Sequence, residues 1–326
     1  MTDPVSDPRS WISSGRFNDV DAQAARYHGY GQQYQQLSPG PFEGRVRSFT
    51  FDDDLVIHFE MANRALAQSA STPRGRFGAC ILAEDSPPCA LNAALCAQDQ
   101  VILCPENKSL EGKTSAGTSI YCLDLSCKLL PDDGFNMRRV GVLGDTTRSR
   151  QLRELIQSGL ATFTALSSPT GYPAASRDFK SSLADLLWRM AAQTEDNDAG
   201  KMRRYTTRRM LRVFRRAREH IDHHLADGIS IVALCRDIGV SRRSMEYAFR
   251  SVIGIGPGSY IRVLQLNNIR RELMAGTSDD VSIGAVAARH GIWHLSRFSS
   301  CYRSLFGELP SQTRLRHARL ITARTG

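Results

Sequence analysis

Two segments in the C-terminal third place arginine and serine side chains just after a glycine that separates two short apolar stretches. The first covers about 230–251, with the break at Gly239, and the second covers about 282–305, with the break at Gly291. Glycine can adopt the left-handed conformation that a tight turn between helices requires, and serine can cap the helices on either side. Arginine donates to phosphates and to guanine, and serine donates to either. This spacing predicts a helix-turn-helix that occurs twice and grips successive turns of DNA.

Each motif needs apolar residues where its helices meet and polar residues on the outer face of its second helix. The residues expected to pack or to form turns are Leu234, Cys235, Gly239, Met245, Ala287, Gly291, Phe298, Gly307 and Pro310. The residues expected to face DNA are Arg242, Arg243, Ser244, Tyr247, Arg250, His294, Ser296, Arg297, Ser299, Ser300 and Arg303. The start of such a second helix reaches base edges, and its peptide dipoles attract phosphate. We expect mixed base and phosphate roles for the arginines, and a larger share of the affinity from the more arginine-rich first motif.

Only helices are expected from residue 208 onward. Apolar spacing predicts one helix over about 208–225, a longer one over about 259–274 between the motifs, and a short one after Pro310. A helix of about 16 residues is ~24 Å long, and the groove faces repeat every ~34 Å along one side of DNA. This helix, with the offset of each motif, can place both second helices on one face of a duplex.

Charge is unevenly spread along the 326 residues. Residues 201–326 hold 23 Lys+Arg against 9 Asp+Glu, whereas residues 1–200 hold 19 against 24. The C-terminal part therefore has a formal charge of +14, and the remainder has −5. This asymmetry favours a polyanion-binding module joined to a domain with another task.

The first 200 residues differ in texture from the rest. Residues 1–40 are polar and are expected to pack loosely, and about 44–127 carries short apolar runs separated by turn residues. That pattern predicts a small β-barrel or sandwich, which can hold one small ligand. Amphipathic helices follow over about 148–192, so we expect an α+β chain with a sensing and dimerisation domain in 1–200 and a DNA-binding domain in 201–326.

The N-terminal part shows no sequence pattern that assigns a ligand pocket, a redox or metal site, or a membrane span. Its six cysteines include no Cys-x-x-Cys pair, so we expect reduced, buried thiols and assign no metal site; they are Cys80, Cys89, Cys96, Cys104, Cys122 and Cys127. Five aromatic side chains could line a pocket but are more often core, and none is assigned an effector contact: Tyr27, Tyr30, Tyr34, His58 and Tyr121. No apolar run approaches the ~20 residues of a membrane span, and no signal-peptide core is present, so we expect a cytoplasmic protein without membrane association.

Catalysis is not expected. Residues 1–200 contain no Gly-x-Ser-x-Gly and no other catalytic constellation, and no cofactor motif is found. Two alternatives to a ligand-responsive regulator stay open: a thiol- or metal-responsive regulator that uses the N-terminal cysteines, and an architectural DNA-binding protein that needs no effector.

The second motif and the residues after it resemble the signature of AraC/XylS-type transcription regulators. Their pattern is roughly I-x-x-[IV]-A-x-x-x-G-F-x-x-x-S-x-F-S-x-x-[FY]-[KR]-x-x-[FL]-G-x-x-P-S, and residues 283–311 follow it closely. The resemblance covers about 205–318. Ile292 stands where phenylalanine is usual and Cys235 where alanine is usual, and both are conservative changes at packing positions.

The resemblance implies a bacterial activator with a cupin-like N-terminal β-barrel and two helices that follow it. Residues 33–44 resemble the start of the ligand-sensing domain in a subgroup of these regulators. Residues 241–244, 254–257 and 293–295 look most like the branch that contains the ethanolamine-utilisation regulator. The implied partners are double-stranded DNA, RNA polymerase, a small-molecule effector of unknown identity and a second copy of the chain.

Overall fold

The computed structural model describes residues 11–130, 141–166, 172–192, 198–276 and 281–316. The chain forms two compact units. The N-terminal unit comprises residues 1–34 and 43–204, and the C-terminal unit comprises residues 35–42 and 205–326. None of the described helices combines the length and the apolar character that crossing a bilayer requires.

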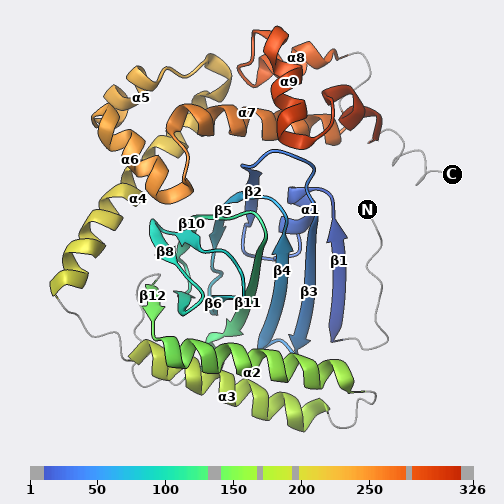
Figure 1. Cartoon of the computed structure of the whole chain (residues 1–326), viewed down its shortest axis with the longest axis vertical. Coiled ribbons are helices and arrows are strands. Elements are labelled where there is room, and N and C mark those ends of the chain that lie inside the picture. Colours follow the sequence, from blue (N-terminus) through green and yellow to red (C-terminus); the bar gives the residue numbers. More distant parts are fainter. Residues whose placement is uncertain (1–10, 131–140, 167–171, 193–197, 277–280, 317–326) are drawn as a thin grey trace. The chain divides into compact units, whose positions relative to one another are not determined.

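The N-terminal unit is built on two antiparallel sheets that do not close into one barrel (Figure 1). The larger sheet has the order β1-β3-β4-β11-β6-β9-β12, and the smaller has the order β2-β5-β10-β7-β8. The strands are β1 (Ile12–Phe17), β2 (Gln33–Gln36), β3 (Gly44–Phe51), β4 (Leu55–Ala62), β5 (Leu66–Ser71), β6 (Arg76–Leu82), β7 (Cys89–Leu91), β8 (Ala94–Cys96), β9 (Gln100–Cys104), β10 (Ser109–Thr114), β11 (Thr118–Ser126) and β12 (Gly141–Gly144). Its helices are α1 (Val20–Ala24), α2 (Thr146–Ala165) and α3 (Tyr172–Ala192), with a 3₁₀ turn at Cys127–Leu129. Strands β3 to β11 lie in the predicted β-rich range of about 44–127, and α2 and α3 are the two helices predicted after it, whereas β1, β2, β12 and α1 lie outside these ranges. The two sheets stay open where the resemblance implies a cupin-like barrel.

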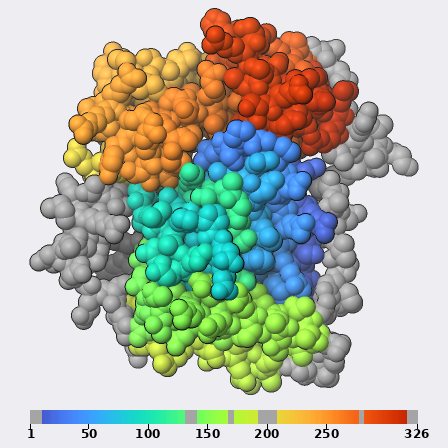
Figure 2. Space-filling model, viewed as in Figure 1, coloured from blue at the N-terminus to red at the C-terminus, as the bar shows by residue number. Residues whose placement is uncertain are grey.

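Helices α2 and α3 cover the larger sheet and complete its core. Leu152, Ile156 and Phe163 of α2 are almost fully buried against side chains from the sheet. In Figure 1, α2 and α3 run across one end of the strands, and Figure 2 shows the green atoms of this region as a layer. The helices meet closely at Gly159, where an added Cβ would lie 2.3 Å from the Phe179 ring. Lys180 on α3 pairs with Asp52 and Asp54 at 2.9 and 3.2 Å and so ties α3 to the β3–β4 turn.

The interior of this unit contains a carboxylate that is held by its own side chains. Glu60 is 3% exposed. It accepts hydrogen bonds from the hydroxyls of Tyr27 and Tyr34 at 2.6 and 2.7 Å and from the Gln23 amide at 2.6 Å. These donors offset the cost of burying the charge. The tyrosines considered as pocket residues are therefore committed to internal contacts.

The other aromatic candidates also have internal partners. Tyr30 donates to Asp124 at 2.6 Å, and Tyr121 stacks on Phe59 with ring centroids 4.7 Å apart. His58 lies against the Tyr27 ring, and its Nδ1 is 2.8 Å from the Ser48 hydroxyl.

His58 should make the stability of this unit depend on pH. Burial lowers the pKa of His58 from 6.5 to about 4. Because the folded value lies below the unfolded one, its contribution is complete above pH 6.5 and is lost as the pH falls toward 4. Between pH 7.5 and pH 5, we expect the natural chain to lose about 2 kcal/mol more unfolding free energy than His58→Gln. Urea unfolding at both pH values tests this, and equal losses in the two proteins would show that His58 is not held neutral.

Five of the six N-terminal cysteines belong to a second, smaller apolar cluster. Cys89, Cys96 and Cys104 pack there with Leu82, and Cys80 and Cys122 lie against it. All eight cysteines of the chain are free thiols. Within the described ranges, no three His, Cys, Asp or Glu side chains come together as a metal site.

The chemistry of these thiols favours packing over reactivity. Burial raises the pKa of Cys104 to about 12, which disfavours the thiolate that metals and oxidants require. A hydrogen bond from Cys96 lowers the pKa of Cys89, but Cys89 is 2% exposed. Cys89, Cys96 and Cys104 are buried, as expected, whereas Cys80, Cys122 and Cys127 are half-buried. The raised pKa of Cys104 does not favour the thiol- or metal-responsive alternative.

The described part of the C-terminal unit is helical apart from residues 35–42. Its helices are α4 (Asp198–His224), α5 (Ile231–Ile238), α6 (Arg242–Ile253), α7 (Pro257–Met274), α8 (Ile283–Arg289) and α9 (Leu295–Phe306), with a 3₁₀ turn at Leu225–Asp227 and further helical residues at 310–316. α4 begins within the N-terminal unit. It is longer than the predicted 208–225 because its polar N-terminal turns have no apolar periodicity to reveal them.

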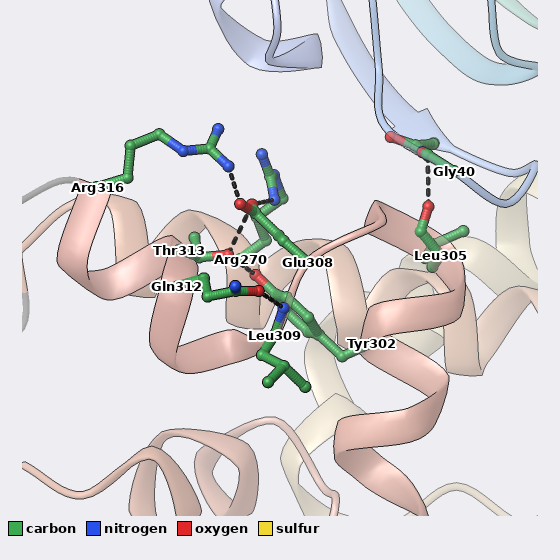
Figure 3. A network of polar contacts seen from close by, with 10 residues as sticks. Gly40, Arg270, Tyr302, Leu305, Glu308, Leu309, Gln312, Thr313 and Arg316 are labelled. Carbon is green, nitrogen blue, oxygen red and sulfur yellow. Dashed lines mark hydrogen bonds and ion pairs between the residues drawn. The ribbon is translucent and has the colours of Figure 1, made fainter.

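The segment 35–42 is the part of the N-terminal sequence that folds with the C-terminal helices. The backbone N–H of Gln36 donates to Asn267 Oδ1 at 3.0 Å, and Asn267 Nδ2 donates to the Gln36 carbonyl at 3.2 Å. Both residues are 2% exposed. The Gly40 N–H donates to the Leu305 carbonyl at 3.0 Å (Figure 3). The prediction that residues 1–40 pack loosely is therefore wrong for this part of the segment.

Candidate nucleic-acid interface

The first motif is a tight helix-turn-helix formed by α5 and α6. Gly239 ends α5 with a φ of +74°, and its N–H donates to the Arg236 carbonyl at 3.1 Å. The next N–H, of Val240, donates to the Cys235 carbonyl at 3.0 Å. Ser241 then caps α6, because its Oγ accepts from the Ser244 N–H at 3.1 Å. These bonds satisfy backbone groups that the ends of the helices would otherwise leave unpaired.

The second motif repeats this geometry in α8 and α9. The Gly291 N–H donates to the Ala288 carbonyl at 3.0 Å, and the Ile292 N–H donates to the Ala287 carbonyl at 3.0 Å. Gly291 has a φ of +76°. The turn holds one more residue than the first, because both Trp293 and His294 separate Ile292 from α9.

The residues expected to pack are in the interfaces between the helices. Leu234, Met245 and Ala287 are 0% exposed, and Cys235 and Phe298 are also buried. Gly307 ends α9 in the left-handed conformation, as Gly254 ends α6. Pro310 is buried at the start of the last described helical turn.

Helix α7 joins the two motifs into one body. It has 18 residues, which corresponds to ~27 Å. Its first turns pack against the first motif, with the Tyr260 and Phe249 rings 5.4 Å apart. Its later turns supply Leu266, Ile269 and Leu273 to the core that holds Phe298. A rod shared by two cores fixes the spacing of the two motifs.

Helix α6 presents a strongly basic outer face. Arg242, Arg243, Tyr247 and Arg250 are exposed, and Ser244 is half-buried beside its cap. Arg250 is held by Glu246 at 2.8 Å, which leaves Arg242 and Arg243 as the arginines without an ion pair on the described part of α6. Two exposed guanidinium groups in the first turn of a helix suit the binding of phosphates or of guanine edges.

Helix α9 presents a different face. His294, Ser296, Arg297, Ser299, Ser300 and Arg303 are all exposed. Arg297 lies in the first turn of α9 and Arg303 lies six residues further along, so α9 carries two arginines where α6 carries three. Ser300 Oγ donates to the Arg297 carbonyl at 3.0 Å. The structure thus brings each set of predicted DNA-facing residues onto the outside of its own second helix.

Sequence reasoning missed a polar network that holds the end of α9. Arg270 and Arg316 both pair with Glu308, and the Thr313 hydroxyl donates to Glu308 at 2.8 Å (Figure 3). The Tyr302 hydroxyl lies 2.9 Å from Thr313. Arg270 lies 38 positions from Glu308, and this pairing follows no periodicity, so no sequence pattern could reveal it. The network fixes the residues after Gly307 to α7 and α9.

Two exposed apolar side chains beside the second motif were also missed. Trp293 is 66% exposed and Leu295 is 48% exposed. The signal for Trp293 was present in the sequence as the extra residue of the second turn.

Comparison with known proteins supports the helix-turn-helix geometry. The family model described as a helix-turn-helix domain matches residues 234–316. The XylDLEGF operon transcriptional activator of Pseudomonas putida is 38% identical over 100 residues, which are 31% of this chain and 31% of that protein. The probable thc operon regulatory protein of Rhodococcus erythropolis is 25% identical over 100 residues, which are 31% of this chain and 30% of that protein.

These two matches span about a third of the length of these curated relatives. Among solved structures, the AraC-like transcriptional activator CuxR is 16% identical, with 84% of this chain and all of that chain covered and a TM-score of 0.45.

Proposed function

We propose that this chain is a DNA-binding transcription regulator of the AraC/XylS type, in which α6 and α9 enter successive major grooves of a bipartite site. The observation that carries the proposal is the repetition of one turn geometry at Gly239 and Gly291, on two motifs joined by α7. Two relatives that match 100 residues of the chain are named as an operon regulatory protein and an operon transcriptional activator, which supports a regulatory rather than an enzymatic role.

We further propose that the chain activates transcription in response to a small molecule and makes contact with RNA polymerase. The matching Pseudomonas putida protein is named as an activator. The sensing and dimerisation roles fall to about residues 1–200, and the DNA-binding role falls to about residues 201–326. Such a regulator acts where bacterial DNA lies, in the cytoplasm.

The finer proposal places the chain in the branch of the ethanolamine-utilisation regulator. It rests on residues 241–244, 254–257 and 293–295, which lie in the DNA-binding part. A thermal shift of the full chain with ethanolamine tests it, since a ligand that binds only the folded state raises its stability. No shift of the melting temperature at millimolar ethanolamine would contradict the assignment to this branch, but it would not contradict the proposed DNA binding.

Selection from random duplexes tests the proposed function itself. We expect the full chain to enrich sequences with two separated invariant blocks, and its affinity to fall steeply with salt because phosphate contacts release counterions. Enrichment that requires an added metabolite pool would support an effector. Salt-sensitive binding without any enriched sequence would instead favour the architectural alternative.

A further inference from the structure

Helices α6 and α9, the second helices of the two motifs, can be compared position by position because their buried residues occur at the same positions. Buried Met245 and Phe298 each occupy the fourth position of their helix. Counted from the same start, Arg242 of α6 corresponds to Leu295 of α9, and Ser244 corresponds to Arg297. The first position is therefore a cation in α6 and an apolar side chain in α9.

The residue added to the second turn strengthens this difference. Ile292 and Val240 make equivalent backbone bonds to the preceding helix, and His294 and Ser241 both stand directly before the second helix. Trp293, between Ile292 and His294, therefore has no counterpart in the first motif. It is 66% exposed, although a tryptophan can bury 150–250 Å² when it finds a partner. Leu295, two residues on, is 48% exposed. Residues 293–297 at the start of α9 are exposed without interruption, and Leu295 also lies near α8, where a Cβ on Gly284 would be 3.0 Å from its Cδ1.

DNA offers one apolar group to a protein that reads its major groove. The 5-methyl group of thymine is the apolar element among the base edges, and the other groups are hydrogen-bond donors or acceptors. The exposed cations Arg297 and Arg303 on the same helix would bring phosphates to this surface. The occupant that suits both features is duplex DNA with thymines in the groove.

We propose that Trp293, together with Leu295, contacts thymine methyl groups, so that the half-site bound by α9 depends on thymine. The half-site bound by α6 depends instead on guanine and phosphate through Arg242 and Arg243. This inference rests on the proposed function, because it specifies the bases that the second recognition helix reads.

Replacement of thymine by uracil in the selected duplex removes single methyl groups and tests the proposal. Each thymine of both half-sites is replaced in turn, and the affinity of the full chain is measured by fluorescence anisotropy at fixed salt. At a contacted position the natural chain should bind about fourfold more weakly, as expected for one lost methyl contact. Trp293→Ala should bind the unmodified duplex roughly tenfold more weakly and should show no further loss with uracil.

Two variants serve as controls. Trp293→Phe keeps an aromatic surface and should retain most of the uracil sensitivity. Leu95→Ala removes an equally exposed apolar side chain from β8 and should leave binding unchanged.

The outcomes separate this inference from the proposed function. Specific binding without a loss of more than about twofold at any thymine, or a uracil effect that is undiminished in Trp293→Ala, would overturn the thymine contact alone. Failure of the natural chain to select any sequence would overturn the proposed function and this inference together.

Discussion

The double variant Arg242→Ala, Arg243→Ala is expected to bind the selected duplex about 100-fold more weakly than the natural chain. Both side chains are exposed in the first turn of α6, where the helix dipole and the reach toward base edges favour contacts to DNA. A good bidentate contact contributes about 1–3 kcal/mol, so two lost contacts cost about 2–6 kcal/mol, a range that begins near 30-fold in affinity and includes 100-fold. If the arginines bind only phosphates, the slope of log affinity against log salt should become shallower by about 2.

The matched control removes the same charge from the other unit. Arg150 on α2 and Arg177 on α3 are also exposed and helical, and Arg150→Ala, Arg177→Ala should change binding little. Equal losses of DNA affinity in the two double variants would show that the α6 arginines act only through the net charge of the chain. No loss in Arg242→Ala, Arg243→Ala would contradict the placement of α6 at the interface.

Gly291→Ala is expected to destabilise the C-terminal unit by about 3 kcal/mol or more, whereas Gly239→Ala should cost about 1 kcal/mol. Both glycines have a positive φ, so each substitution introduces backbone strain. At Gly291, an added Cβ would also lie 2.4 Å from the Leu225 carbonyl oxygen, while at Gly239 nothing lies within 4 Å. The two glycines thus have the same turn conformation, but only Gly291 is closely packed by a neighbouring segment.

Urea unfolding followed by far-UV circular dichroism compares the two variants under one set of conditions. Equal destabilisation would show that the chain relieves the contact at Gly291 by moving the turn at Leu225–Asp227. Gly239→Ala is the matched control, because it introduces the same backbone strain without the steric contact at Gly291.

The local parts of the interface could be predicted from sequence because they depend on nearest neighbours. Gly239 and Gly291 mark the turns, and the apolar residues around them have the spacing of packed helices. The outer faces of α6 and α9 follow from the same periodicity. The strands and helices of the N-terminal part were also visible in alternation and spacing, such as β3 and β4 around the turn at Asp52.

The long-range parts could not be predicted. The pairing of Gln36 with Asn267 joins positions 231 residues apart, and it depends on two polar side chains in stretches without a distinctive pattern. Strand order is hidden in the same way, since β1 pairs with β3 while β2 belongs to the other sheet. The burial of Glu60 could not be predicted either. An acidic residue in an alternating strand does not indicate that three side chains will donate hydrogen bonds to it in the core.

A hydroxyl-radical footprint of the full chain on its selected duplex shows directly whether two recognition helices bind the DNA. Two protected patches are expected on one face of the DNA, with centres one helical turn (~34 Å) apart. Arg242→Ala, Arg243→Ala should weaken one patch more than the other. A single patch, or uniform protection along the duplex, would contradict a reader with two recognition helices.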